Sequence, residues 1–443
     1  MERTRHPLRA LSALALLVSV AAALAACGGS SMSLDGPADP PSGNSPPPSS
    51  GVTAAKQVVA DEQAGSPADP RIVAADNGLG LSLLNLLDQN ATDNIALSPT
   101  SIALAFEMLY NGAAGSTQQG MSQALELGSF SSAQDVDNAN ASLQAALMDA
   151  DPNVTITIAN SLWMNLSNNP VSPTFTEVNQ TYYAAEIGDL AGAPANVNAW
   201  VSAATQGLIT QLLPPGDYLN ATLILANAIY FKGAWTSPFN PSATTSQPFT
   251  LSDGTQITCQ MMQQPGSFAY YEGANFQMVR LPYGEAHLSM IIILPASGVS
   301  LASFVAGMTL TDLDGWIAQL DSSYTVKLGL PKFKASYTTE PTGGDSQLPP
   351  ALTTLGMGAA FDPSQADFSG IAPHLFVTDA VHQTVVEVDE TGTIAAAATG
   401  ISTTTFAGGP TATMFMNRPF FYAIRDDDNG ALLFVGLLMN PAS

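Results

Sequence analysis

The pattern of apolar and polar residues predicts helices in the first part of the chain. Leu81-Ser-Leu-Leu-Asn-Leu-Leu has its apolar residues at helical spacing, as in an amphipathic helix. A second helix is predicted to begin at Ser98-Pro99, with Ser98 as the N-cap and Pro99 in the first turn. Its body, residues 102–110, is almost wholly apolar, which indicates a helix buried in the core. Residues 117–150 carry further helical segments.

Strand patterns dominate further along the chain. Val154-Thr-Ile-Thr-Ile alternates in polarity, and Ser161-Leu-Trp-Met also predicts a strand. Thr222-Leu-Ile-Leu-Ala-Asn-Ala-Ile-Tyr-Phe and Met290-Ile-Ile-Ile-Leu-Pro are continuous apolar runs, typical of strands buried on both faces. Tyr324-Thr-Val-Lys-Leu-Gly-Leu-Pro alternates again. Helices first and strands later favour an α+β fold, and the sequence has no internal repeat.

Composition narrows the classes of partner. The chain has 443 residues, of which 46% are apolar, enough for a sizeable core and more than a single small domain needs. Its formal net charge is −24, from 12 Lys and Arg against 36 Asp and Glu. This balance repels phosphate and sulfate groups, so neither nucleic acid nor heparin is expected as a partner.

The first residues are typical of a secretory signal. A positively charged start precedes a short apolar stretch from Leu11 to Leu24. Leu24-Ala-Ala-Cys27-Gly resembles a bacterial lipobox, which predicts that residues 1–26 are removed and that Cys27 is lipidated. An ordinary signal peptide, cleaved at an Ala-x-Ala site, is the alternative. Lipidation of Cys27 would leave Cys259 without a cysteine partner, so no disulfide is expected.

Between this signal and the first helix lies a segment without large apolar residues. Residues 27–70 are rich in Ser, Pro, Gly and Ala, which predicts a flexible tether in front of a domain at residues 71–443. Gly28 after the cysteine resembles lipoproteins that are sent to the outer membrane. The expected location is therefore extracytoplasmic, anchored by lipid to a bacterial membrane, or extracellular.

One segment near the C-terminus suits two environments. Residues 390–406 read Glu390-Thr-Gly-Thr-Ile-Ala-Ala-Ala-Ala-Thr-Gly-Ile-Ser-Thr-Thr-Thr-Phe and are small and nearly neutral. The four alanines favour helix, but the neighbouring Gly, Thr and Ser residues do not. Such a segment can lie in solvent or insert between two strands without a clash. It follows the strand-like His382-Gln-Thr-Val-Val-Glu-Val.

This segment resembles the hinge of the reactive centre loop of inhibitory serpins. Further motifs fall in serpin order: Asn94-Ile-Ala-Leu-Ser-Pro-Thr-Ser-Ile, Asn227-Ala-Ile-Tyr-Phe-Lys-Gly-Ala-Trp, Ala366-Asp-Phe-Ser-Gly-Ile, Ala380-Val-His, Asn417-Arg-Pro-Phe and Leu433-Phe-Val-Gly-Leu-Leu-Met-Asn-Pro. The resemblance covers about residues 71–443. It implies an α+β fold of about nine helices and three β-sheets, with an exposed loop that can insert into the main sheet. It also implies a monomer without cofactors.

The activity that the resemblance implies is suicide inhibition. A serine protease, or a papain-like cysteine protease, attacks the loop and forms an acyl-enzyme. The cut loop then inserts as an extra strand and carries the protease with it. The implied hinge comprises Glu390, Gly392, Thr393, Ala395, Ala396, Ala397 and Ala398.

Two properties of the loop agree with insertion and indicate a target. Alternate residues from Thr393 to Ile401 would face the sheet interior, and all of them are small or apolar. Counting from the hinge places the reactive bond at Phe406–Ala407, which suits chymotrypsin-like or subtilisin-like proteases. The segment before Asn417 is about two residues longer than is typical of the family. Thr405 and Met414 are therefore alternatives for the residue before the reactive bond.

The resemblance also assigns two clusters that control opening of the sheet. Ser98, Ser101, Asn227 and His382 match the shutter, which lies beneath the point where the sheet opens. Trp235, Lys332 and Glu390 match the breach at the top of the sheet, where Lys332 and Glu390 are expected to form an ion pair.

No motif in the sequence indicates an enzyme. A metalloprotease helix motif, a nucleophile elbow, a phosphate-binding glycine loop and paired metal-ligating cysteines are all missing from the sequence. Two alternatives to inhibition are a non-inhibitory serpin that binds or stores a ligand, and a loop that is only cleaved as a substrate. Gly400, Gly408 and Gly409 would favour the second by making the loop flexible.

Overall fold

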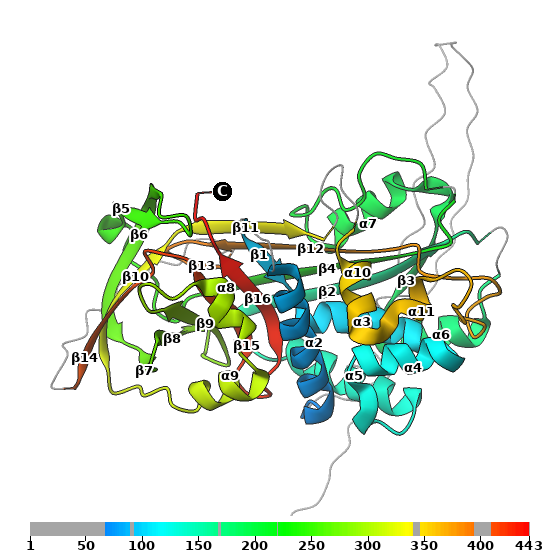
Figure 1. The fold of residues 1–443 in the computed structure, drawn as a ribbon, viewed down its shortest axis with the longest axis horizontal. Coiled ribbons are helices and arrows are strands. Elements are labelled where there is room, and N and C mark those ends of the chain that lie inside the picture. Colours follow the sequence, from blue (N-terminus) through cyan, green and yellow to red (C-terminus); the bar gives the residue numbers. More distant parts are fainter. Residues whose placement is uncertain are drawn as a thin grey trace, which may run out of the picture. The chain divides into compact units, whose positions relative to one another are not determined.

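The computed structural model describes residues 67–88, 93–166, 170–218, 220–339, 346–393 and 409–442 (Figure 1). They all lie in one compact unit. Ten α-helical segments occur in these ranges, two of them with only four or five residues. No helix among the described residues is long and apolar enough to cross a membrane.

The main sheet has six strands in the order β11-β12-β13-β4-β2-β3. Their bounds are β2 Val154–Met164, β3 Glu186–Asp189, β4 Leu223–Ala234, β11 Phe333–Thr338, β12 Asp379–Val388 and β13 Gly392–Thr393. The predicted buried run from Thr222 forms β4. Eleven of the twelve residues of β4 pair antiparallel with β2, from Leu223 opposite Met164 to Gly233 opposite Val154. The two segments predicted after Val154 form the single strand β2.

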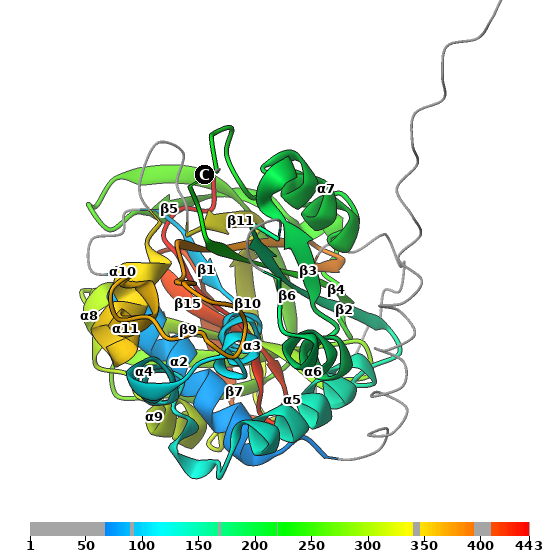
Figure 2. The same ribbon diagram turned by 90° about the vertical axis from the view of Figure 1, so that its right-hand side faces the viewer.

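Helices cover both faces of this sheet (Figures 1 and 2). On one face α7 (Ala195–Ala204) packs through Val197 and Val201 onto Trp163 and Ile224. The other face is covered by α3 and the helices around it. These are α2 Pro70–Asp88, α3 Pro99–Tyr110, α4 Gly115–Ala124, α5 Ala133–Met148, α6 Pro173–Tyr183, α10 Leu348–Leu352 and α11 Gly358–Phe361.

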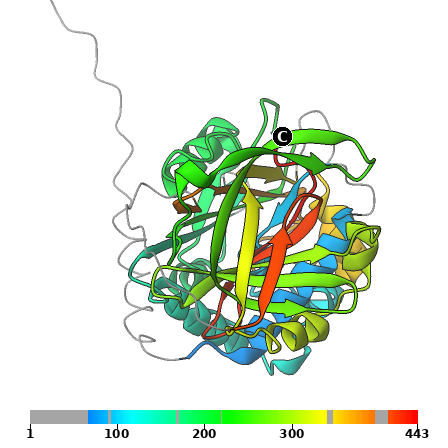
Figure 3. The ribbon, with the colours of Figure 1, turned by 90° about the vertical axis from the view of Figure 1, so that its left-hand side faces the viewer.

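Two further sheets complete the unit. One has the order β1-β16-β15-β9-β8-β7 and the other β14-β10-β6-β5, which lies on the side shown in Figure 3. Their strands are β1 Ile95–Leu97, β5 Thr245–Thr250, β6 Gln256–Ser267, β7 Ala269–Glu272, β8 Phe276–Tyr283, β9 Leu288–Pro295, β10 Thr325–Pro331, β14 Thr411–Phe415, β15 Phe420–Asp426 and β16 Leu432–Leu438. Helices α8 (Leu301–Ala306) and α9 (Leu310–Ile317) follow β9.

The predicted fold class is confirmed, because helices are layered on three β-sheets. The start of α3 is also as predicted: the Ser98 side chain accepts a hydrogen bond from the Ser101 N–H, and Pro99 occupies the first turn. All residues of α3 except Tyr110 are buried, in agreement with its apolar sequence.

Candidate functional site: an opening in the main sheet

The two central strands of the main sheet are only partly paired. β4 and β12 run parallel, and they pair directly where Ile224–Ala228 lies beside Asp379–Gln383. Beyond this point the two-residue strand β13 stands between them: Thr393 pairs with Val388 of β12 and Gly233 of β4. No strand pairing joins the intervening residues, 229–232 and 384–387, within the described part of the sheet. We call this stretch the seam.

A tight turn directs the chain into the seam. The Asp389 carboxylate accepts hydrogen bonds from the N–H groups of Thr391 (2.7 Å) and Gly392 (3.2 Å), and from the Thr391 hydroxyl (2.6 Å). The Asp389 N–H donates to the Gly392 carbonyl at 3.0 Å. An aspartate that binds the backbone two and three residues ahead is typical of a stable reversal. The turn therefore fixes where the loop begins.

Gly392 and Thr393 are each suited to their positions. A methyl group added to Gly392 would overlap the carbonyl oxygen of Gly233, so only glycine allows this close approach. Thr393 is fully buried, and its hydroxyl lies 2.6 Å from the Tyr283 hydroxyl. Tyr283 stacks on Trp235 with ring centroids 4.5 Å apart. The seat for Thr393 is thus small and apolar, with one polar contact.

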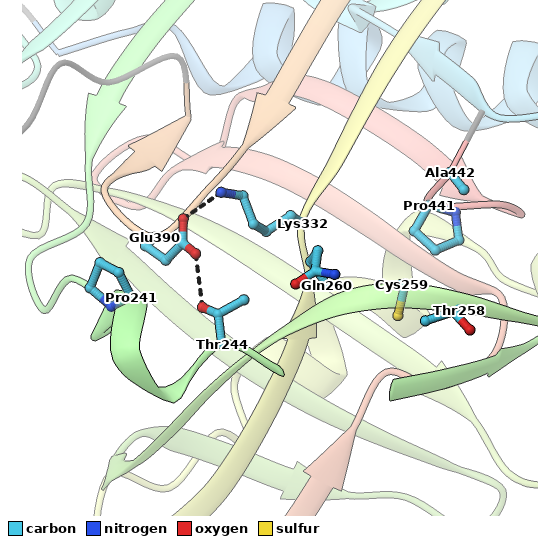
Figure 4. Close-up of a pocket in the computed structure, with 9 residues that line it drawn as sticks. All are labelled: Pro241, Thr244, Thr258, Cys259, Gln260, Lys332, Glu390, Pro441 and Ala442. Atoms are coloured by element: carbon cyan, nitrogen blue, oxygen red, sulfur yellow. Dashed lines mark hydrogen bonds and ion pairs between the residues drawn. The ribbon is translucent and has the colours of Figure 1, made fainter. Parts of the chain in front are cut away.

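The breach residues hold the base of the turn. Trp235 donates its backbone N–H to the Thr391 carbonyl (2.9 Å) and its indole N–H to the Asp389 carbonyl (3.0 Å). Glu390 accepts from Lys332 Nζ at 2.7 Å and from the Thr244 hydroxyl at 2.8 Å (Figure 4). Burial alone would raise the pKa of Glu390, but the hydrogen bonds from Lys332 and Thr244 outweigh it and lower the pKa.

A cavity of about 460 Å³ adjoins this ion pair. It is lined by Pro241, Thr244, Thr258, Cys259, Gln260, Lys332, Glu390, Pro441 and Ala442 (Figure 4). Cys259 has a free thiol in the strand β6, and burial raises its pKa. No group of His, Cys, Asp and Glu side chains suited to a metal ion occurs in the ranges that the structure describes.

The four shutter residues meet at the closed end of the seam. Asn227 and His382 are partners in the last rungs of the β4–β12 pairing, and the Asn227 Oδ1 lies 2.6 Å from the His382 Nδ1. The Ser98 N–H donates to the His382 Nε2 at 3.1 Å, so the proton of a neutral imidazole is assigned to Nδ1. Ser101 donates its hydroxyl to Asn227 Oδ1 at 2.9 Å.

The network continues beyond these four residues. The Asn227 amide donates to the Ser101 carbonyl (2.7 Å) and to the Asn160 Oδ1. His382 is fully buried, and burial lowers its pKa to about 3. Its backbone N–H donates to the Thr339 hydroxyl at 3.0 Å. A neutral histidine can serve as donor on one ring nitrogen and acceptor on the other, as this network requires.

Several of these contacts involve residues that no sequence motif indicates. Tyr283, Asn160 and Thr339 are distant from the hinge in the sequence, and Asp389 directly precedes it. Ala395 to Ala398, the proposed reactive bond Phe406–Ala407, and Cys27 lie outside the described residues. Met414, an alternative at the reactive bond, is fully buried in β14 and is therefore closed to a protease in this structure.

The fold and the site define a class of protein. Residues 394–410 connect β13 in the main sheet with β14 in another sheet, and among the described residues β4 and β12 have no strand partner along the seam. A family model described as serpin (serine protease inhibitor) matches residues 74–441. The chain therefore belongs to the serpin family, a family of protease inhibitors rather than enzymes.

Individual relatives agree with this assignment. The chain is 33% identical over 390 residues to a leukocyte elastase inhibitor of Homo sapiens, covering 84% of this chain and 100% of the relative. It is 29% identical to a serine protease inhibitor of Cyanea capillata, covering 84% of this chain and 98% of the relative. The native crystal structure of tengpin, a thermophilic serpin, has a TM-score of 0.75 and 27% identity, covering 86% of this chain and 98% of tengpin.

One solved structure with this fold is named for the ligand that it binds and not for protease inhibition. Thyroxine-binding globulin in complex with thyroxine has a TM-score of 0.73 and 26% identity. The match covers 83% of this chain and 99% of that protein.

The buried His382 predicts a specific loss of stability in acid. Its pKa is near 3 in the fold against 6.5 in the unfolded chain, so the unfolded state binds more protons between these values. The stabilisation is complete above pH 6.5 and declines as the pH falls. At pH 5 the loss is about 2 kcal/mol. Urea unfolding at pH 7 and pH 5 should show that the change in the free energy of unfolding is less favourable by about 2 kcal/mol in the parent chain than in His382→Gln, because the contributions of the other titrating groups cancel in this comparison.

A second histidine provides the control. His287 is exposed, and its hydrogen bond to Asp428 raises its pKa, so its stabilisation is present below pH 6.5 and lost above it. His287→Gln should therefore change the pH dependence in the opposite direction, with a larger loss of stability in acid than in the parent chain. An identical pH dependence in His382→Gln and the parent chain would contradict the assignment to His382.

The contact between Thr393 and Tyr283 predicts a measurable coupling. Tyr283→Phe leaves the buried Thr393 hydroxyl without its partner, while Thr393→Val with Tyr283→Phe removes both polar groups. A double-mutant cycle on the free energy of unfolding should give a coupling of about 1 kcal/mol. The nearby Tyr422 hydroxyl is buried without a partner, so Tyr422→Phe should cost little. A coupling near zero would show that Thr393 does not occupy this seat.

Proposed function

We propose that this serpin inhibits serine proteases as a suicide substrate. The observation that supports the proposal is the seam: Thr393 occupies its first position, and beyond it the facing edges of β4 and β12 are not paired with each other or with any other described strand. Each further residue that enters gains backbone hydrogen bonds on two sides. After cleavage of the loop, these bonds favour insertion of residues 394–406 and movement of the attached protease.

The residues of the loop indicate the class of target. Phe406 suits a protease with a deep apolar primary pocket, so we propose chymotrypsin-like or subtilisin-like enzymes, and papain-like cysteine proteases as further candidates. The relatives named as inhibitors support a protease as the partner. The net charge of −24 supports a protein that does not use heparin or nucleic acid, and we propose that it acts as a monomer.

Ligand binding without inhibition is the alternative function, since thyroxine-binding globulin shares the fold. The seat of Thr393 favours inhibition, because a small residue there allows the loop to continue into the sheet. The cavity at the breach is lined by mixed polar and apolar residues and contains the Lys332–Glu390 ion pair. Its position beside the hinge links it to the loop rather than to an independent ligand.

Mixing the chain that begins at residue 28 with chymotrypsin tests the proposal. The expected product is a band at the summed mass that survives denaturing electrophoresis, because the trapped acyl-enzyme is covalent. Thr393→Arg should abolish this band while the loop is still cleaved, since an arginine cannot be buried in the seat at Thr393. Thr411→Arg, at an exposed threonine of β14, should leave the band intact.

The same experiment locates the reactive bond. Mass spectrometry of the released C-terminal peptide should place the cut between Phe406 and Ala407, and a cut after Thr405 would correct the register. Complete cleavage of the parent chain without a stable band would show that the chain is a substrate, and not an inhibitor, of this class of protease.

We further propose that the mature protein is anchored to a bacterial membrane, with the outer membrane expected, through a lipid on Cys27. The lipobox-like Leu24-Ala-Ala-Cys27-Gly and the Ser- and Pro-rich residues that follow support this location. Cys27→Ala should move the protein from the membrane fraction to the soluble extracytoplasmic fraction. Cys259→Ala is the matched control, because this buried cysteine belongs to the folded unit. A parent chain that is soluble would favour the ordinary signal peptide.

A further inference from the structure

The helices beneath the main sheet bury carboxyl groups that lack cationic partners. Asp76 of α2 and Glu107 of α3 are each 1% exposed. Both carboxylate oxygens of Asp76 and the Oε1 of Glu107 are buried without a hydrogen-bond partner. None of the ion pairs among the described residues includes either group. Two carboxyl groups in this situation require a physical explanation, because burial of an unpaired carboxylate is strongly unfavourable.

The polar groups around the pair supply too few donors. The Asn140 amide donates to the Glu107 Oε2 at 2.8 Å. Asp137 takes its own donors, the Tyr183 hydroxyl and the Asn111 amide, both at 2.7 Å. The Oδ1 atoms of Asn140 and Asn179 are also buried without partners. The cluster therefore has an excess of acceptors, and a proton on a carboxyl group would convert one acceptor into a donor.

No neighbouring element pairs a cation with either carboxyl group in the described structure. The charged group that acts on Glu107 is acidic, Asp137 of α5, and another acidic group, Glu126 just after α4, lies against Gly78 of α2. Arg71 of α2 is engaged by Asp69 and Asp135. Helix α9 brings only acidic groups, while α4, α8, α10, β1, β2 and β16 contain no ionisable side chain. Lys232, near the end of β4, forms no ion pair in the described structure.

Electrostatics then favours the protonated forms. Burial raises the pKa of Asp76, and the neighbouring Glu107 raises it further. Burial also raises the pKa of Glu107, to about 8, although the hydrogen bond from Asn140 acts in the opposite direction. Two carboxyl groups that repel each other titrate as a unit. The proton that the pair retains therefore belongs to both groups and not to one residue.

We propose that Asp76 and Glu107 form a buried proton-binding pair, which retains at least one proton at neutral pH and whose deprotonation in alkali loosens the packing of α2 on α3. The consequence reaches the sheet, because α3 begins with Ser98 and Ser101 of the shutter. Alkaline pH therefore weakens the support of the closed sheet. The proposal concerns the free protein and does not depend on protease inhibition.

The sign of the effect is opposite to that of His382. A carboxyl group with a raised pKa stabilises the fold fully below its unfolded pKa, and this stabilisation is lost as the pH rises through the folded value. Unfolding of the parent chain should therefore release a proton between about pH 5 and pH 8. Its unfolding equilibrium constant should rise up to tenfold per pH unit for one proton.

Urea unfolding of the full chain between pH 6 and pH 9 tests the proposal. Glu107→Gln imitates the protonated side chain and keeps an acceptor for Asn140, so its stability should lose this pH dependence and exceed that of the parent chain at pH 9. Asp76→Asn should act in the same direction. Glu177→Gln, at an exposed position of α6, should follow the parent chain. Equal pH dependence in the parent chain and Glu107→Gln would overturn the proposal.

Infrared spectroscopy keeps the test decisive if the variants do not fold. The parent chain at pH 7 should show the carbonyl stretch of a protonated carboxyl group, and this band should disappear at alkaline pH. If the band is missing from the spectrum of the folded parent chain at pH 7, both buried groups are ionised and the proposal is wrong.

Discussion

The structure depends on one rung of the main sheet, where Asn227 faces His382. These two side chains are hydrogen-bonded across the strands β4 and β12, one rung before direct pairing ends at Ala228 and Gln383. On one side of this rung β4 and β12 are paired, and on the other side, beyond the pair Ala228–Gln383, no described strand lies between them until β13. A strand that extends through the seam must separate Asn227 from His382 before it can proceed. A single hydrogen bond contributes only about 1 kcal/mol, but this one is tied to Ser98, Ser101 and Asn160 in a dry environment, so its loss would disturb all of them.

Opposite forces act at the other end of the seam. Gly392 and Thr393 already pair with both neighbouring strands, so the hinge lies in the position from which insertion would continue. Unpaired strand edges favour the addition of a strand. The intact chain opposes it, because residues 394–408 must also reach β14, where Thr411 to Phe415 pair with β10. Cleavage of the loop would remove this second constraint, which explains physically how one broken peptide bond can change the preferred strand order.

The sequence predicts the elements that have local signals, but it does not predict contacts between residues that are far apart in the chain. The continuous apolar run of β4 and the Ser98-Pro99 helix start are local signals, and both are found in the structure. The single strand β2 was predicted as two segments because Ala159 and Asn160 interrupt the alternation, and Asn160 is buried in the network instead. Contacts such as Tyr283 with Thr393 join residues 110 positions apart. Only the packing of β8 against the hinge brings them together, so no local pattern indicates them.

The shortage of cations connects the hinge with the buried carboxyl groups. With 12 Lys and Arg for 36 Asp and Glu, the chain can pair few of its carboxylates. Arg71, Arg280, Arg425, Lys332 and Lys334 each pair with one or more acidic groups, all of them partly accessible to water. Deeper carboxyl groups must then rely on hydrogen-bond donors, as Asp137 does, or on protons. Lys332 is thus used at the hinge, where Glu390 must stay ionised to hold the turn, whereas Asp76 and Glu107 lie where a neutral carboxyl group is compatible with tight packing. This distribution makes the helices under the sheet sensitive to alkali and the shutter sensitive to acid, because the two sites require opposite changes in bound protons on folding.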